Sequence, residues 1–308
     1  DWTMYKHIFV IDDEKIQADG LAKQLNGRMG GNGYVFEPLS DEHEIMQAVA
    51  DRFCSLAIVD LRMDDYPFNG LEICRRILEN NPLAKVIIVS AWLPEFVTAM
   101  QDLMTSGCVL AVSEKKSMAE WVPELEQTVA GYFEKRDGEF SENSKMLLNA
   151  YSSAKNEKDP FRKGVLFEDF LVNLFGQIGF QFIRKRVTDA TSEVDLILRN
   201  DIDDAFLAKF GKYIFVEAKN RPSAPVDKND FLAFVSKIES SSGLAELGII
   251  AASHKIASTV RLEALRSSHK SVKVLLFAND ELTRLIVADD KRYELKKLID
   301  EQIKDVPS

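Results

Sequence analysis

The sequence has few residues that could bind zinc or form disulfides. Its 308 residues include only 3 cysteines, none of them in a CxxC spacing, and 4 scattered histidines. Zinc sites and disulfide frameworks need such residues in sets with short, regular spacing. We therefore expect the cysteines to be reduced thiols in a core, as is usual for proteins of the cytosol.

Long hydrophobic runs are also missing. No apolar stretch approaches the roughly 18 residues that a membrane-spanning helix needs. The N-terminal part does not resemble a signal peptide, because Asp12, Asp13 and Glu14 interrupt its early apolar stretch. Together with a composition of 46% hydrophobic and 29% charged residues, these absences predict a soluble, cytoplasmic protein with no membrane partner.

Positive charge is scarce in the first half of the chain. Residues 1–136 carry 22 acidic and 13 basic side chains, a net of −9, whereas residues 137–308 carry 27 acidic and 26 basic ones. The first half should therefore repel nucleic acid, but the nearly neutral second half can still carry a local basic patch. Arg184, Lys185 and Arg186 form a short basic run that could contact phosphate or lie in a solvated turn.

Short apolar runs alternate with amphipathic stretches in the first half. Such runs, when helices separate them, are typical of parallel strands that are buried on both faces. The expected strands are 8–11, 34–36, 56–59, 86–89 and 109–112, and the expected helices are 15–26, 42–51, 70–80, 94–106 and 118–135. This order predicts a flavodoxin-like (βα)5 fold, which binds its ligands at the carboxyl ends of the strands.

The second half is expected to form another α/β domain. The predicted strands are 193–198, 213–218, 247–251 and 273–277, and the predicted helices are 164–179, 228–240, 255–267 and 294–304. No helix separates the first two strands, so a mixed sheet is expected. The polar stretch 136–160 is interpreted as a partly helical linker between a domain at 1–135 and a domain at 161–308.

Charged and hydroxyl side chains follow the predicted strands of the first half. Asp12 and Asp13 follow the first strand in IFVIDDEK, and Asp60 ends the third strand in LAIVDLRMDD. Carboxylates grouped at one sheet edge can hold Mg²⁺, and one of them can attack a phosphoryl group beside the ion. Ser90 ends the fourth strand and Lys115 follows the fifth, where a hydroxyl and a lysine can steady phosphoryl oxygens.

These segments closely resemble the receiver (CheY-like) family over residues 6–135. The resemblance implies that Asp12, Asp13 and Asp60 bind Mg²⁺. It also implies that a sensor histidine kinase is the partner and that Asp60 accepts the phosphoryl group. The first half is therefore expected to be the input module of a two-component response regulator.

By the same resemblance, Ser90 is the switch hydroxyl and Lys115 is the phosphate-binding lysine. Lys116 is the alternative lysine, since the segment carries one residue more than is usual. Two features depart from the family pattern. The loop LRMDDYPFNG is longer than usual, and the fifth strand has Leu110 or Ala111 where an aromatic switch residue is common.

A second set of charged residues lies in the second half. Glu217 and Lys219 in YIFVEAKN are two positions apart on a predicted strand, so their side chains leave the same face. Asp195 lies on the preceding strand, in SEVDLIL, and Glu168 lies on the helix GVLFEDFL. Two carboxylates can hold a metal ion that polarises a phosphodiester, and a lysine can orient the attacking water.

This arrangement resembles the PD-(D/E)XK nuclease superfamily, in particular its Mrr-type restriction endonuclease branch, over residues 161–270. The resemblance implies that Asp195 and Glu217 bind Mg²⁺ or Mn²⁺, that Lys219 is the catalytic lysine and that Glu168 is an auxiliary acid. It further implies action on DNA, commonly as a homodimer.

The two sets of residues predict a response regulator whose output is a magnesium-dependent, DNA endonuclease-like domain. The alternative is a signalling adaptor in which the nuclease-like domain is catalytically inactive and serves dimerisation or the binding of a partner or nucleic acid. A transcription factor is not favoured, because the C-terminal part shows no helix-turn-helix pattern.

Overall fold

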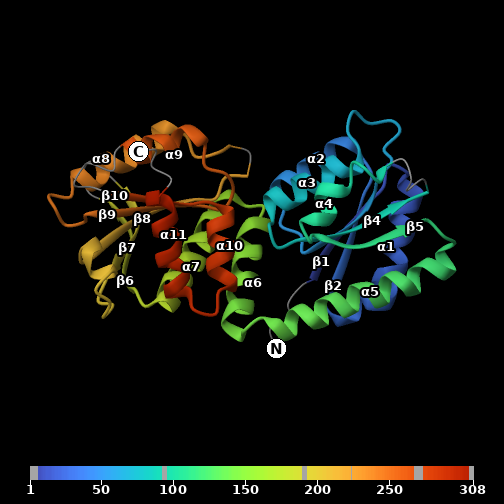
Figure 1. Cartoon of the computed structure of the whole chain (residues 1–308), viewed down its shortest axis with the longest axis horizontal. Coiled ribbons are helices and arrows are strands. Elements are labelled where there is room, and N and C mark those ends of the chain that lie inside the picture. The colour runs from blue at the N-terminus through green and yellow to red at the C-terminus, as the bar shows by residue number, and fades with distance from the viewer. Residues whose placement is uncertain (1–5, 92–95, 189–192, 223, 267–272, 305–308) are drawn as a thin grey trace. The chain divides into compact units, whose positions relative to one another are not determined.

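The computed structural model describes residues 6–91, 96–188, 193–222, 224–266 and 273–304 (Figure 1). The chain divides into two compact units, Asp1–Phe140 and Ser141–Ser308. Within the described ranges, none of the helices combines the length and the apolar character that a bilayer crossing needs.

The first unit is built on a five-stranded sheet with the strand order β2-β1-β3-β4-β5. Each neighbouring pair of strands is parallel, which confirms the predicted flavodoxin-like sheet. The strands are β1 (Lys6–Ile11), β2 (Tyr34–Leu39), β3 (Leu56–Asp60), β4 (Lys85–Ser90) and β5 (Val109–Glu114). The helices are α1 (Lys15–Met29), α2 (Glu42–Asp51), α3 (Gly70–Asn80), α4 (Gln101–Thr105) and α5 (Met118–Glu139).

Each face of this sheet has its own core, because successive strand residues point to opposite sides. Phe9 and Val59 pack with the apolar residues of α2, α3 and α4. Ile8 and Ile58 pack on the other face with α1 and α5, and Figure 1 shows these two groups of helices on opposite sides of the sheet. All five residues of β3 are buried, so the central strand can hold its terminal Asp60 in a rigid place.

The fourth helix is shorter than the sequence predicts. Helix α4 covers only Gln101–Thr105, and residues 97–100 form turns instead of extending it. β-Branched Val97 and Thr98 disfavour a helix in this stretch, and Met100 provides no side-chain cap. The first residues of the predicted helix, 94 and 95, lie outside the described residues.

The second unit contains a mixed sheet with the strand order β10-β9-β8-β7-β6. Strands β8, β9 and β10 are parallel to one another, whereas β6 and β7 run antiparallel to their neighbours. The strands are β6 (Gln181–Thr188), β7 (Glu193–Arg199), β8 (Tyr213–Lys219), β9 (Leu247–Ala252) and β10 (Lys273–Phe277). The mixed character of the predicted sheet is therefore confirmed.

Strand β6 is absent from the sequence-based prediction. The basic run at its centre, for which a solvated turn was one interpretation, is strand: Arg184 pairs with Ile197, and Lys185 pairs with Leu196. The turn interpretation is wrong. The segment QFIRKRVT has too few apolar residues to be recognised as a strand, and it is stabilised by its antiparallel pairing with β7.

Helices cover this second sheet: α6 (Glu142–Asn156), α7 (Pro160–Ile178), α8 (Lys228–Glu239), α9 (Ser258–Arg266), α10 (Asn279–Val287) and α11 (Lys291–Lys304). Most of the stretch interpreted as a linker is α6, which packs on α7 and α10 within the second unit. The side chain of Tyr151 in α6 is fully buried, and its ring centroid lies 4.9 Å from that of Phe170. Only Phe140 and Ser141 separate α5 from α6.

Candidate functional sites

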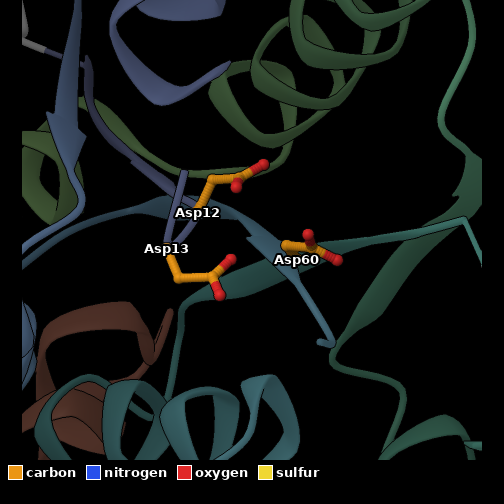
Figure 2. A group of neighbouring side chains, drawn as sticks. All are labelled: Asp12, Asp13 and Asp60. Carbon is orange, nitrogen blue, oxygen red and sulfur yellow. The ribbon is translucent and has the colours of Figure 1, made fainter. Parts of the chain in front are cut away.

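Three carboxylates meet at the carboxyl edge of the first sheet. Asp12 and Asp13 follow β1, and Asp60 ends β3; each offers an oxygen within 4.8 Å of the others. Figure 2 shows the three side chains as neighbours, with Asp12 and Asp13 on one strand end and Asp60 beside them. Among the residues that the structure describes, this is the only such group of three potential metal ligands. Hard carboxylate oxygens are the ligands that Mg²⁺ prefers, so the donor set fits this ion.

Backbone hydrogen bonds orient the first two carboxylates. The N–H of Glu14 donates to Oδ1 of Asp12 at 2.9 Å, and the N–H of Asp64 donates to Oδ2 of Asp13 at 2.9 Å. Burial raises the pKa of Asp13, although the hydrogen bond from Asp64 acts in the opposite direction. The long loop after β3 therefore folds back onto the acidic group and supplies part of its support.

Lys115 provides the positive charge of this site. Its amino group lies 2.7 Å from Oδ2 of Asp12 and 2.6 Å from Oδ2 of Asp60. Burial raises the pKa of Asp60 and the bond from Lys115 opposes that rise. Burial disfavours the charge of Lys115, but its bonds to Asp12 and Asp60 outweigh this effect and raise its pKa. Lys116 instead pairs with exposed Glu124 at 2.6 Å, away from the three carboxylates.

A bulge in β5 explains why the sequence alone could not decide between Lys115 and Lys116 as the lysine of this site. Val86 pairs with Val109, but the next residue of β4, Ile87, pairs with Ala111, so Leu110 is skipped. The bulge absorbs the extra residue of this strand. It brings Lys115, and not Lys116, to the edge of the sheet.

Ser90 ends β4 next to this site. It lies one position beyond the paired residues Asp60 and Val89, and its side chain is buried. Its carbonyl accepts a hydrogen bond from the N–H of Lys115 at 3.3 Å. The structure thus gathers Ser90, Lys115 and the three carboxylates at one sheet edge, as the sequence predicts.

Two supporting features were not predicted from the sequence. Helix α3 begins at Gly70, where a Cβ atom would lie only 2.0 Å from the carbonyl oxygen of Asp60, so any larger residue would collide with the strand end. The hydroxyl of Tyr66, in the long loop, donates to the carbonyl of Ser40 at 2.5 Å. The length of that loop was a signal, but its contacts depend on the tertiary fold.

The fold and the acidic sheet edge define an α/β domain that binds its ligand at the carboxyl ends of parallel strands. The family model described as response regulator receiver domain matches residues 8–126. The N-terminal unit is a response regulator receiver domain, of the kind found in two-component signalling. Receiver domains bind Mg²⁺ at an acidic site, which here is the group Asp12, Asp13 and Asp60.

Several solved structures are similar to part of the chain. The response regulator TrrA from Thermotoga maritima, solved in complex with Mg(2+)-BeF, is 20% identical, with 40% of this chain and 98% of that chain covered and a TM-score of 0.29. A CheY-like receiver domain protein from Methanospirillum hungatei JF-1 is 19% identical, with coverages of 42% and 98% and a TM-score of 0.33. The receiver domain of a modulated diguanylate cyclase from Desulfovibrio desulfuricans G20 is 18% identical, with coverages of 42% and 95% and a TM-score of 0.34. No curated protein matches the chain.

A second charged group lies where β7 and β8 run side by side. The carboxylate of Asp195 accepts a hydrogen bond from the N–H of Ala218 at 2.7 Å. On either side of Ala218, the amino group of Lys219 lies 2.9 Å from Oε1 of Glu217, and Glu217 is buried. The spacing of two along the strand thus brings Glu217 and Lys219 together on one face, as predicted.

Helix α8 adds a further lysine to this group. The amino group of Lys237 lies 3.0 Å from Oε2 and 3.2 Å from Oε1 of Glu217. The sequence left open whether Lys237 faces the site or the solvent, and the structure places it on Glu217. Asp230, from the first turn of α8, lies 3.7 Å from the amino group of Lys219. Both oxygens of Glu217 are therefore engaged by lysine.

The pKa of Asp195 shows how closely the acids are placed. Burial, together with the negative charges of Glu217 and then Glu168, raises the pKa of Asp195 to about 6. The bond from Ala218 and the charge of Lys219 oppose this rise. Glu168 itself is buried on α7. All four residues that the sequence predicts for this site are therefore close enough to interact electrostatically.

The predicted metal ligands of this second group fit a divalent cation in chemical type. Asp195 and Glu217 offer hard oxygens, and a cation bound between them would oppose the rise that the charge of Glu217 causes in the pKa of Asp195. Among the described residues of the second unit, however, no three potential ligands lie within 4.8 Å of one another. A metal site at Asp195 and Glu217 stays a prediction.

Proposed function

We propose that this protein is a two-component response regulator with a magnesium-dependent, DNA endonuclease-like output. A sensor histidine kinase phosphorylates Asp60, and the phosphorylated receiver controls the second unit. The observation that carries the proposal is the presence, in one chain, of two separate groups that combine carboxylates with lysine. One group lies in the receiver domain, and the other contains Asp195, Glu217 and Lys219.

In the receiver, Asp60 is the proposed nucleophile. A carboxylate oxygen of Asp60 forms a bond to phosphorus while the bond from phosphorus to the imidazole nitrogen of the kinase breaks and the imidazole leaves. Asp12 and Asp13 would hold Mg²⁺, which supplies the charge that screens the phosphoryl donor. Lys115, already 2.6 Å from Asp60, neutralises a phosphoryl oxygen. The hydroxyl of Ser90 is the proposed second donor to the phosphoryl group.

In the second unit, Asp195 and Glu217 would hold a divalent cation, Mg²⁺ or Mn²⁺, with Glu168 as an auxiliary acid. When bound, the ion supplies Lewis acidity toward a phosphodiester of DNA. Lys219 orients the attacking water or neutralises the charge that develops on the phosphate. Lys237 keeps the buried carboxylate of Glu217 compensated when the substrate is absent. A homodimer would supply one such site for each strand of a duplex.

A plasmid cleavage assay tests the endonuclease proposal. Full-length protein is incubated with supercoiled DNA and Mg²⁺ or Mn²⁺, with and without acetyl phosphate. We expect divalent-cation-dependent nicking that Lys219→Ala abolishes. Lys212→Ala is the matched control, because Lys212 is an exposed lysine that immediately precedes β8. Equal inactivity of the natural protein and Lys219→Ala in both phosphorylation states would refute the proposal.

One observation favours the alternative of a catalytically inactive adaptor. Because two lysines already engage the oxygens of Glu217, this carboxylate is charge-compensated without a metal ion. A site of this kind can persist as a structural element of a dimerisation or binding domain. In that case Asp195→Ala leaves the biological output intact while Asp60→Ala abolishes it, and sedimentation analysis detects a phosphorylation-dependent homodimer.

A further inference from the structure

Three elements of the second unit meet at the residue that follows Lys219. The side-chain amide of Asn220 donates to the carbonyl of Ala154 in α6 and to the carbonyl of Lys163 in α7, each at 3.0 Å. Its oxygen accepts a hydrogen bond from the hydroxyl of Ser253, just after β9, at 2.6 Å. One side chain thus connects α6, α7 and the end of β9 to the end of β8.

Two buried polar side chains of α6 also bond to Ser253, which lies just after β9. The hydroxyl of Tyr151 lies 3.0 Å from the carbonyl of Ser253 and 2.6 Å from Oδ1 of Asn279. The amino group of Lys155 donates to the same two oxygens at 2.8 and 3.3 Å. Tyr151 and Lys155 are 0% and 1% exposed, so water cannot replace these bonds if α6 shifts. A displaced α6 must therefore move Ser253 or lose the bonds.

Ser253 passes such a movement on to the candidate site by two routes. Its N–H donates to the carbonyl of Lys219 at 3.0 Å, and its hydroxyl holds the side chain of Asn220. Lys219 is the last residue of β8. Its partly exposed amino group lies 2.9 Å from Oε1 of Glu217. The position of Lys219 therefore depends on the position of α6.

The other end of α6 is joined to the receiver by a very short connection. Helix α5 ends at Glu139 and α6 begins at Glu142, so the stretch of chain from one helix end to the other spans at most about 10 Å. The hydroxyl of Ser141 accepts a hydrogen bond from the N–H of Ser144, which caps α6 and shortens the free part of the connection further. Helix α6 is thus the first element of the second unit after the receiver in chain order.

We propose that α6 is the coupling element between the two sites, and that Asn220 is the positioning residue through which α6 holds Lys219. Phosphorylation of Asp60 changes the force on α6, and the bonds of Asn220 transmit this change to Lys219. The inference rests on the proposed function for the chemical identity of the second site. The coupling itself concerns the position of Lys219, whether or not the unit cleaves DNA.

The chemical reactivity of Lys219 tests this coupling. Full-length protein is labelled with an amine-reactive succinimidyl ester, and the rate at Lys219 is measured by peptide mass spectrometry relative to exposed Lys212. Labelling is done with and without beryllofluoride and Mg²⁺, which mimic the phosphorylated aspartate. We expect the rate at Lys219 to differ between the two states. Asn220→Ala should raise the rate about fivefold, the factor expected for losing one ordinary hydrogen bond, and abolish the difference.

Asn200→Ala is the matched control. The side-chain amide of Asn200 also donates to two carbonyls, those of Leu207 and Gly211, but it lies in the connection before β8 begins. This variant should keep the beryllofluoride response of Lys219. If Asn220→Ala impairs folding, Asn220→Asp replaces it, because the aspartate keeps the acceptor for Ser253 and loses only the two donors. The coupling is refuted if Lys219 labels equally in both states, or if the folded Asn220 variant retains the response.

Plasmid cleavage by the same samples separates this inference from the proposed function. A natural protein that shows coupled labelling of Lys219 but cleaves no DNA contradicts only the endonuclease proposal. A protein that cleaves DNA while Asn220→Ala or Asn220→Asp leaves the labelling response unchanged contradicts only the coupling.

Discussion

The amino group of Lys115 lies 2.6 Å from Oδ2 of Asp60, so the proposed phosphoacceptor is paired with a cation before any phosphoryl group arrives. The same amino group is 2.7 Å from Asp12. Because one lysine compensates two neighbouring carboxylates, it affects both the stability of the receiver domain and the chemistry of Asp60.

Replacing Lys115 with alanine should destabilise the first unit and weaken phosphorylation. The change leaves Asp12 and Asp60 as neighbouring carboxylates without their cation, which we expect to cost about 2 kcal/mol of unfolding free energy. Urea titration measures this cost, and phosphoryl transfer from acetyl phosphate, followed on a phosphate-affinity gel, measures the chemistry. Lys116→Ala is the control, since Lys116 pairs with exposed Glu124. Equal behaviour of the two variants would show that Lys115 has no special role.

Magnesium should stabilise the first unit through its three clustered carboxylates. At a concentration about 100 times its dissociation constant, an ion that binds only the folded state adds about 2.7 kcal/mol. Asp13→Asn removes one predicted ligand and should shrink this gain, whereas Glu134→Gln, an exposed acid on α5, should preserve it. Thermal unfolding with increasing Mg²⁺ is the measurement. An undiminished gain in Asp13→Asn would exclude that residue as a ligand.

The raised pKa of Asp195 predicts a specific pH dependence. Because the folded state holds the proton up to a pH of about 6, whereas the unfolded chain releases it near 3.8, stability is lost as the pH rises through this window. Asp195→Asn removes this loss. Its advantage over the natural protein should be near zero below pH 4 and on the order of 3 kcal/mol above pH 6, in the absence of divalent ions.

Urea unfolding over this pH range, followed by a probe in the second unit, measures the advantage of Asp195→Asn. Asp203→Asn is the control, because the side chain of Asp203 is exposed in the same unit. A difference between Asp195→Asn and the natural protein that stays constant with pH would contradict the assigned environment of Asp195.

A methyl group at position 70 should disturb the end of β3. The new Cβ atom would lie 2.0 Å from the carbonyl oxygen of Asp60, and such overpacking costs at least about 2 kcal/mol. Gly131→Ala in α5 is the opposite case, because nothing lies within 4 Å of its Cβ position. It should stabilise the helix by about 0.5 to 1 kcal/mol. Calorimetry that ranks the two variants the other way would contradict the packing described for Gly70.

The receiver sheet and its acidic edge could be predicted because they depend on local patterns. Continuous apolar runs mark the buried strands, and the polar residues that follow them must share one edge. The bulge at Leu110 could not be predicted, since it is a matter of pairing between β4 and β5. The sequence therefore left Lys115 and Lys116 as alternatives.

The second unit was less predictable where long-range contacts determine the structure. Strand β6 lacks an apolar pattern and depends on β7 for its hydrogen bonds. Helix α6 reads as a polar linker, yet it carries Tyr151 and Lys155 into the interior, where they reach oxygens about 100 residues or more away in the sequence. A charged side chain in such a position is recognised only when its partners are known.

The lysines at Asp60 and Glu217 have a consequence for how the protein matures. They act as counterions that belong to the chain itself, so part of the negative charge of each acidic group is offset as soon as its domain has folded. Both groups therefore have a counterion in place before any metal ion or phosphoryl donor binds.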